Sequence, residues 1–219
     1  MEQEIDLLKY YPKTKRNVID RGAFKTEEDR KIARKFGKEF FDGDRKNGYG
    51  GFSYNPRFWQ PVLPTFKKQY DLKKESSVLD VGCAKGFMLY DMMKMIDGIK
   101  IQGIDISDYA INNSLNEVKN YLSVANALDL PFEENSFDLV ISITTIHNLD
   151  RDGCIQALKE IERVSRKNSF ITVDAYCNEE EKKLMYDWNL TAKTILHEDE
   201  WKVLFYEAGY TGDYYWFKP

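Results

Sequence analysis

The sequence predicts an α/β fold in which helices cover both faces of a mainly parallel, twisted sheet. From residue 76 onward, short apolar runs typical of buried strands alternate with helical segments, and this alternation indicates βαβ units. The 219 residues suffice for one well-cored domain with an accessory segment but are few for two independent domains. We therefore expect a core domain over residues 76–219, preceded by an extension over residues 1–75.

The elements of the core follow from its apolar runs and from the residues that suit helix starts and turns. Strands are predicted over 77–81, 99–105, 122–125, 137–143, 170–175 and 210–217, and helices over 87–96, 107–121, 151–165, 179–190 and 198–208. Ser107 suits a helix cap because its hydroxyl can accept a backbone N–H. The aromatic strand at 210–217 closes the chain, and we expect it to run antiparallel to the other strands.

The extension combines helices with a loop rich in glycine and aromatic residues. Thr26 suits the cap of a helix whose apolar residues recur every four positions from Ile32 to Phe40. Residues 43–59 then bring glycines and large rings together, as mobile lids do, although a connector whose rings fill the core has the same composition. A second helix is predicted over 57–70, bent or divided by its prolines.

Composition argues against several classes of protein. The cysteines Cys83, Cys154 and Cys177 are widely spaced, which argues against a disulfide framework or a thiolate zinc site. Only His147 and His197 remain for a histidine-rich metal centre, so we expect no metal. No apolar run approaches the ~20 residues of a membrane span, and the acidic first residues lack the pattern of a secretory signal. We therefore expect a cytoplasmic protein that does not enter a membrane.

The net charge of −4 hides an uneven distribution. Residues 1–75 carry 18 Lys and Arg against 12 Asp and Glu, a surplus of +6, which leaves −10 for the remainder. An electropositive extension can attract an anionic substrate, but the same charges also occur on an ordinary solvated helix face. We expect no nucleic-acid partner, because such proteins normally show a stronger basic excess and a recognisable module.

A glycine-containing turn joins the first core strand to its helix. The strand ends at Val81, the turn reads Gly82-Cys83-Ala84-Lys85-Gly86, and a helix begins at once. Glycine is needed where the backbone approaches a nucleoside closely, because a Cβ would collide with the ligand. Asp105 ends the next strand, 19 residues beyond Gly86, and a carboxylate at that spacing accepts hydrogen bonds from ribose hydroxyls in Rossmann-type sites. The combination predicts a nucleoside site in a Rossmann-like domain.

This turn, with Asp80 before it and glycines at 82 and 86, resembles the first motif of class I S-adenosylmethionine (SAM)-dependent methyltransferases. Three later segments resemble the second, third and fourth motifs of that family in the proper order: residues 103–107, 125–132 and 135–142. The resemblance extends over about residues 76–217, although the usual Pro-Gly turn before the fifth strand is missing. It implies a Rossmann-like methyltransferase core with SAM as the cofactor.

The resemblance also implies roles for individual residues. Asp105 would hold the ribose, Ile106 would pack on the adenine, and Asn126 stands where an acidic residue usually contacts the adenine amino group. An amide oxygen can accept that hydrogen bond as well. The full set of implied cofactor-binding residues is Asp80, Gly82, Cys83, Ala84, Gly86, Asp105, Ile106, Asn126, Ala127 and Ser142.

Candidate catalytic residues follow the fourth and fifth strands, because ligands of open α/β folds bind beyond the carboxyl ends of the strands. His147 is the only histidine in its segment, and imidazole suits general-base work near neutrality, although a lone histidine is more often structural. Asp174 and Tyr176 are alternatives, and each is also explained as a hydrogen-bonding residue at a strand end.

The loop of the extension supplies candidate lid residues. The rings of Tyr49, Tyr54 and Trp59 could close over SAM, since aromatic faces attract a sulfonium cation. Arg57, with Arg45 or Lys46, could then meet a carboxylate or phosphate on the acceptor.

The sequence leaves three functions open. The first is methyl transfer to a small molecule, with an oxygen of a sugar, a nucleotide-sugar or another small anionic metabolite as the acceptor. The second is a SAM-using enzyme of different outcome, which cyclises, cleaves or hydrolyses the cofactor, since fold does not fix chemistry. The third is a SAM-binding protein without catalysis. The sequence does not indicate the oligomeric state.

Overall fold

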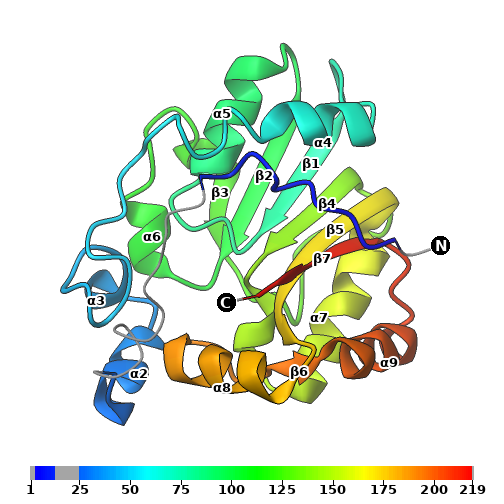
Figure 1. The fold of residues 1–219 in the computed structure, drawn as a ribbon. Coiled ribbons are helices and arrows are strands. Elements are labelled where there is room, and N and C mark those ends of the chain that lie inside the picture. Colours follow the sequence, from blue (N-terminus) through cyan, green and yellow to red (C-terminus); the bar gives the residue numbers. More distant parts are fainter. Residues whose placement is uncertain (1–2, 13–24, 219) are drawn as a thin grey trace.

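The computed structural model of the chain describes residues 3–12 and 25–218. It contains a seven-stranded sheet in the order β3-β2-β1-β4-β5-β6, with β7 also paired to β5 (Figure 1). The strands are β1 (Ser77–Val81), β2 (Lys100–Asp105), β3 (Leu122–Val124), β4 (Phe137–Ile143), β5 (Ser165–Tyr176), β6 (Leu196–His197) and β7 (Asp213–Phe217). The predicted α/β class with a mainly parallel sheet is confirmed.

Helices cover both faces of this sheet, as predicted (Figure 1). The helices are α2 (Glu27–Ala33), α3 (Lys38–Phe41), α4 (Leu63–Gln69), α5 (Phe87–Met95), α6 (Asp108–Asn112), α7 (Arg151–Val164), α8 (Glu179–Trp188) and α9 (Glu198–Ala208). Side chains alternate between the two faces of a strand, so β1 buries Leu79 toward α7 and α9 and Val78 toward α4 and α5. Strands buried on both faces read as the continuous apolar runs seen in the sequence.

The last strand is parallel to its neighbour, so the predicted antiparallel strand at 210–217 is wrong. Residues Phe170–Asp174 of β5 pair in parallel with Asp213–Phe217 of β7. The reason is the short strand β6, which pairs in parallel with the end of β5 and passes directly into α9. A strand, a crossover helix and a second strand return the chain in the same direction, as in every βαβ unit.

Three predicted helices are shorter than expected. The helix capped by Thr26 ends at Ala33, because Phe36 adopts a left-handed φ of 49° before α3 begins. The predicted helix at 107–121 ends at Asn112, where Asn113 and Ser114 turn their side chains to backbone carbonyls of the preceding turn. At 57–70, only the part from Leu63 to Gln69 is helical.

The first described residues attach to β7 and α4. Ile5 donates its N–H to the carbonyl of Tyr214 at 2.9 Å, and the Thr65 hydroxyl bonds the carbonyl of Leu7 at 2.7 Å. Helices α2 and α3 lie near α6 and α8 (Figure 1). No helix within the described residues is long and apolar enough to cross a membrane.

Candidate active site

The turn between β1 and α5 is tied to the neighbouring strand. The N–H groups of Gly82 and Cys83 both donate to the carbonyl of Ile104, at 2.8 and 2.9 Å. Gly82 has a φ of +88°, and a Cβ there would lie 2.1 Å from Oγ1 of Thr145. This position therefore requires glycine, both for its backbone conformation and for its closeness to the residues after β4.

Two carboxyl groups lie beside this turn. Asp105 accepts the N–H of Ala84 and the N–H of Ser107, each at 2.8 Å. Burial raises the pKa of Asp105, and these two donors oppose the increase. Burial and the charge of Asp105 together raise the pKa of Asp80 to about 7. A cationic ligand at this place would favour the ionised form of both groups.

A cavity of about 1520 Å³ opens at the carboxyl ends of the strands. Small-molecule sites commonly occupy about 300–1,000 Å³, so this cavity exceeds the need of one ligand. The predicted site residues that line it are Asp80, Gly82, Cys83, Ala84, Asp105, Ile106, Asn126, Ala127, His147, Asp174, Tyr49, Arg57 and Trp59. Gly86 is not among the residues that line the cavity; it is the N-cap residue of α5 and has a φ of +75°.

Three of the predicted site residues lie elsewhere. Ser142 is fully buried and donates to the carbonyl of Val81 at 3.0 Å, which joins β4 to β1. Tyr176 packs in a separate apolar cluster beneath α8. The hydroxyl of Tyr54 donates to Asp91 on α5 at 2.7 Å, so its ring anchors the extension and does not cover the cavity. Each of these three side chains contacts another part of the chain, so they stabilise the fold around the site.

His147 and Asp174 face each other at the edge of the cavity. Nδ1 of His147 accepts the backbone N–H of Asp174 at 2.9 Å and lies 3.5 Å from its carboxylate. Burial lowers the pKa of His147 to about 3 and raises the pKa of Asp174 to about 7. The second carboxylate oxygen, Oδ2, accepts a hydrogen bond from the amide of Asn189.

Comparison with known proteins identifies the family to which this arrangement belongs. A family described as "Methyltransferase domain" matches residues 72–209. The chain belongs to this family. Within the described residues no group of three or more His, Cys, Asp or Glu could hold a metal ion.

Individual relatives resemble parts of this chain. It is 36% identical over 80 residues to the mitochondrial arginine-hydroxylase NDUFAF5 of Mus musculus, over 36% of this chain and 23% of that protein. It is 33% identical over 109 residues to the ajmaline N-methyltransferase of Rauvolfia serpentina, over 46% and 36%. The chain spans less than two thirds of the length of the curated relatives it matches.

The fold of the chain is also that of solved structures. A SAM-dependent methyltransferase from Aquifex aeolicus aligns with a TM-score of 0.51 at 21% identity, over 67% of this chain and 78% of that one. At this identity the likeness shows the fold, which the chain shares with SAM-dependent methyltransferases. The residues around the turn fit SAM, because two carboxyl groups and the 56% exposed apolar side chain of Ile106 adjoin one cavity.

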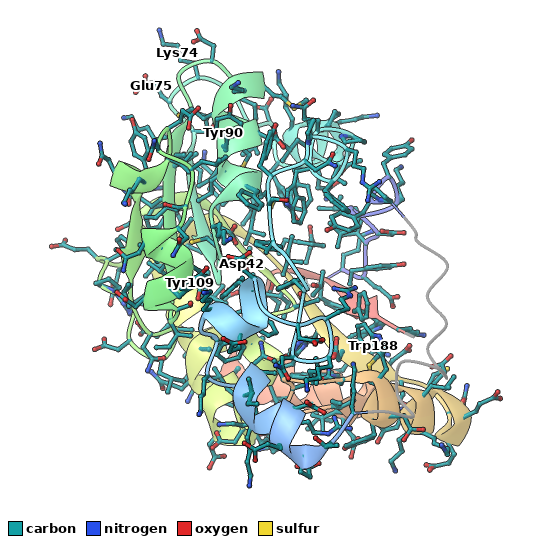
Figure 2. The ribbon with its side chains drawn as sticks, turned by 90° about the vertical axis from the view of Figure 1, so that its left-hand side faces the viewer. Asp42, Lys74, Glu75, Tyr90, Tyr109 and Trp188 are labelled. Carbon is teal, nitrogen blue, oxygen red and sulfur yellow. The ribbon has the colours of Figure 1, made fainter. Side chains whose placement is uncertain are left out.

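An ion pair that the local sequence does not predict attaches the extension to the turn. The ammonium of Lys85 donates to Asp42 at 2.7 Å and to the carbonyl of Phe52 at 2.8 Å. The hydroxyl of Tyr109 on α6 also donates to Asp42, at 2.8 Å, and Figure 2 shows these two side chains together. Nothing in the local sequence predicts these pairs, since the residues are far apart in the chain.

A second set of contacts joins α2 to the segment that follows α8. Arg30 donates to the carbonyls of Asn189 and Tyr186, and Arg34 donates to the carbonyls of Thr191 and Ala192. Cations are favourable at the carboxyl end of a helix, where carbonyl groups lack helical partners. The positive charge of the extension is thus partly used to hold α2 against this segment, which contains Asn189.

Proposed function

We propose that the enzyme transfers the methyl group of SAM to an oxygen of a small anionic acceptor, such as a sugar, a nucleotide-sugar or another small acid. One observation carries this proposal: basic and aromatic side chains line the same cavity as Asp80 and Asp105. SAM supplies an electrophilic methyl group on a sulfonium, and the remaining space accommodates an acceptor beside it. A cytoplasmic location and a division into an extension (1–75) and a core (76–219) stay predictions.

The cofactor is assigned to the carboxyl side of β1 and β2. Asp105 is held by two backbone donors and keeps lone pairs for the ribose hydroxyls. The exposed side chain of Ile106 offers an apolar face to the adenine. Asn126 accepts the N–H of Leu128 at 3.0 Å, and its amide oxygen has a second lone pair for the adenine amino group. Asp80 is assigned to the cationic end of SAM.

The acceptor is assigned to the part of the cavity that the extension and the chain after α8 enclose. Lys35, Lys46, Arg57 and Lys193 line the cavity, and their side chains form no ion pair with any described residue. Unpaired cations in a partly enclosed site attract carboxylate or phosphate groups. The rings of Phe58 and Trp59 lie beside Arg57 and suit the apolar part of such an acceptor.

Much of the catalysis in this proposal is positioning. Holding two reactants in line converts a bimolecular reaction into an effectively unimolecular one, which is worth about 7–11 kcal/mol in favourable cases. Residues that hold SAM and residues that hold the acceptor therefore both contribute to the rate. An oxygen acceptor additionally needs a base that removes its proton.

An untargeted experiment can identify the acceptor. The enzyme is incubated with SAM and a cell metabolite extract, and mass spectrometry searches for compounds that gain one methylene in mass. A methylated anionic compound supports the proposal; a methylated cationic or neutral compound contradicts the assigned class of acceptor.

The assignment of Asp105 to the ribose is tested by the variant Asp105→Ala. It should lose SAM affinity by about tenfold or more in calorimetry, because hydrogen bonds to a charged group contribute about 1.5–3 kcal/mol.

A different use of SAM is the second candidate, because a fold does not fix the chemistry that it supports. Incubation with SAM alone separates the two functions. Products derived from SAM in the absence of any acceptor would favour cyclisation, cleavage or hydrolysis over methyl transfer. SAM binding with neither kind of product would favour a binding protein without catalysis.

A further inference from the structure

Three side chains at the edge of the cavity, those of His147, Asp174 and Asn189, are connected by direct contacts. These contacts indicate a role for each side chain. We propose that Asp174 removes the proton of the acceptor, that neutral His147 orients the acceptor through its Nε2–H, and that Asn189 positions Asp174. This inference rests on the proposed methyl transfer and reverses the expectation that His147 is the base. Its support comes from the hydrogen-bond directions around each side chain.

The hydrogen bond at Nδ1 fixes the protonation of His147. A backbone N–H can only donate, so Nδ1 accepts from Asp174 and carries no proton. The neutral ring then holds its proton on Nε2. Within the described part of the chain no group bonds to Nε2, and His147 is one of the residues that line the cavity. Nε2 therefore offers a donor to a bound acceptor, which is the opposite of what a general base requires.

Asp174 has the complementary arrangement. Its Oδ2 is occupied by the amide of Asn189, while Oδ1 accepts no hydrogen bond from any described residue and lies 3.5 Å from Nδ1 of His147. The side chain is 2% exposed and borders the cavity. Burial raises the pKa of Asp174 to about 7, and a base of that strength is well matched to catalysis near neutral pH.

The proposed step balances without another reactant. The O–H bond of the acceptor breaks, its proton passes to Oδ1 of Asp174, and the freed electron pair forms the new bond to the methyl carbon. The electrons of the old carbon–sulfur bond stay on sulfur, which becomes a neutral thioether. Asp174 returns its proton to water after the products leave.

Asn189 is assigned as a positioning residue because all of its polar groups are engaged. Its side-chain oxygen accepts the N–H groups of Thr191 and Ala192, at 2.9 and 2.7 Å, and its amide donates to Asp174. Arg30 of α2 holds its backbone carbonyl. The extension thereby fixes the segment that orients the base.

Few other groups influence this pair. On β5, Thr172 precedes Asp174 and borders the same cavity. From α9, the indole of Trp201 donates to the backbone carbonyl of Asp174 at 2.9 Å. From the segment after α8, Lys193 donates its backbone N–H to the carbonyl of His147 at 3.0 Å. His147 and Asp174 themselves are therefore the titratable side chains in direct contact here.

The state of His147 is measurable without an acceptor. The chain has two histidines, so ¹⁵N NMR of the imidazoles gives two signal sets, and a His197→Gln variant assigns them. Burial lowers the pKa of His147 to about 3, well below the ordinary value of about 6.5. We therefore expect His147 to remain neutral, with the proton on Nε2, from about pH 5 to about pH 8. Titration of His147 in that range, or a proton on Nδ1, would overturn the proposal.

Single-turnover kinetics test Asp174 with the unmethylated acceptor that the extract experiment identifies. Asp174→Asn should slow transfer by about 10²- to 10⁴-fold while the affinity for SAM stays unchanged. The matched control is Asp97→Asn, an exposed carboxyl in the turn after α5, which should leave the rate unchanged. Transfer by Asp174→Asn at the wild-type rate overturns the inference but leaves methyl transfer intact, whereas absence of wild-type transfer contradicts the proposed function.

The pH profile tests Asn189. Its hydrogen bond opposes the raised pKa of Asp174, so Asn189→Ala should shift the rising limb of the rate–pH profile to higher pH. Loss of fold stability alone would lower the rate at every pH without moving that limb. An unmoved limb would therefore overturn the positioning role.

Discussion

At the scale of single residues, Asp80 is the group whose charge state the cofactor should change most. Its pKa is raised to about 7 by burial and by Asp105. If Asp80 contacts the cationic end of SAM, it must lose its proton when SAM binds. We therefore expect the affinity for SAM to rise by up to about tenfold per unit between about pH 5.5 and about pH 7.

Calorimetry at several pH values measures this dependence. Asp80→Asn keeps the size of the side chain and removes its charge, so it should weaken SAM binding and flatten the pH dependence over the same range. Equal slopes for the wild type and the variant would show that Asp80 does not face the cation.

Residues also differ in how far the sequence reveals them. Asp80, Asp105 and the glycines of the turn are predictable because a ligand-binding turn needs them at fixed local spacing. Ser142 and Tyr176 were predicted to lie in the site, but their side chains contact other parts of the fold. Alternate residues of a strand point to opposite faces, so a position at a strand end does not by itself place a side chain in the site. Asn189 carries no local signal, since its role depends on a contact with Asp174 on another element.

At the scale of elements, the core was more predictable than the contacts through which the extension docks on it. Strands at 77–81 and 137–143 and the helix at 198–208 lie where the apolar pattern and caps place them. The direction of β7 was wrong because the two-residue strand β6 is too short to give a pattern. The extension docks through side chains that its own sequence cannot pair, such as Asp42 with Lys85.

This ion pair leads to a prediction about the docking of α3. Asp42 accepts from both Lys85 and Tyr109, and the Lys85 side chain is only 9% exposed. Asp42→Asn leaves the buried ammonium without its counter-charge, so urea unfolding should report a loss of about 1–3 kcal/mol. Hydrogen exchange should increase over residues 38–52, which the pair holds against the turn.

Tyr109→Phe serves as the matched control for this change. It removes one hydrogen bond to Asp42 but keeps the ion pair, so it should cost less than Asp42→Asn and leave the exchange of residues 38–52 close to that of the wild type. Equal effects of the two variants would mean that the ion pair contributes nothing beyond the hydrogen bond from Tyr109.

At the scale of the whole molecule, a buried base links activity to stability. The pKa of Asp174 rises from 3.8 to about 7 on folding. The folded state therefore holds this proton more tightly than the unfolded state. The contribution to stability is fully present below about pH 4 and is lost as the pH rises through about 7. A carboxyl group that is ready to accept a proton near neutrality thus destabilises the fold at the pH where it works.

The consequence is a stabilising variant that is catalytically weak. Asp174→Asn removes the buried charge and keeps an oxygen for the amide of Asn189, so it should raise the melting temperature at about pH 8 by at least a few degrees. Near pH 4 the wild-type carboxyl is protonated, and the two proteins should melt together. Scanning calorimetry at both pH values makes the comparison, with Asp97→Asn as an exposed control that should change neither. A lower melting temperature for Asp174→Asn at pH 8 would mean that the carboxylate stabilises the fold, and its burial could then not be the reason for a raised pKa.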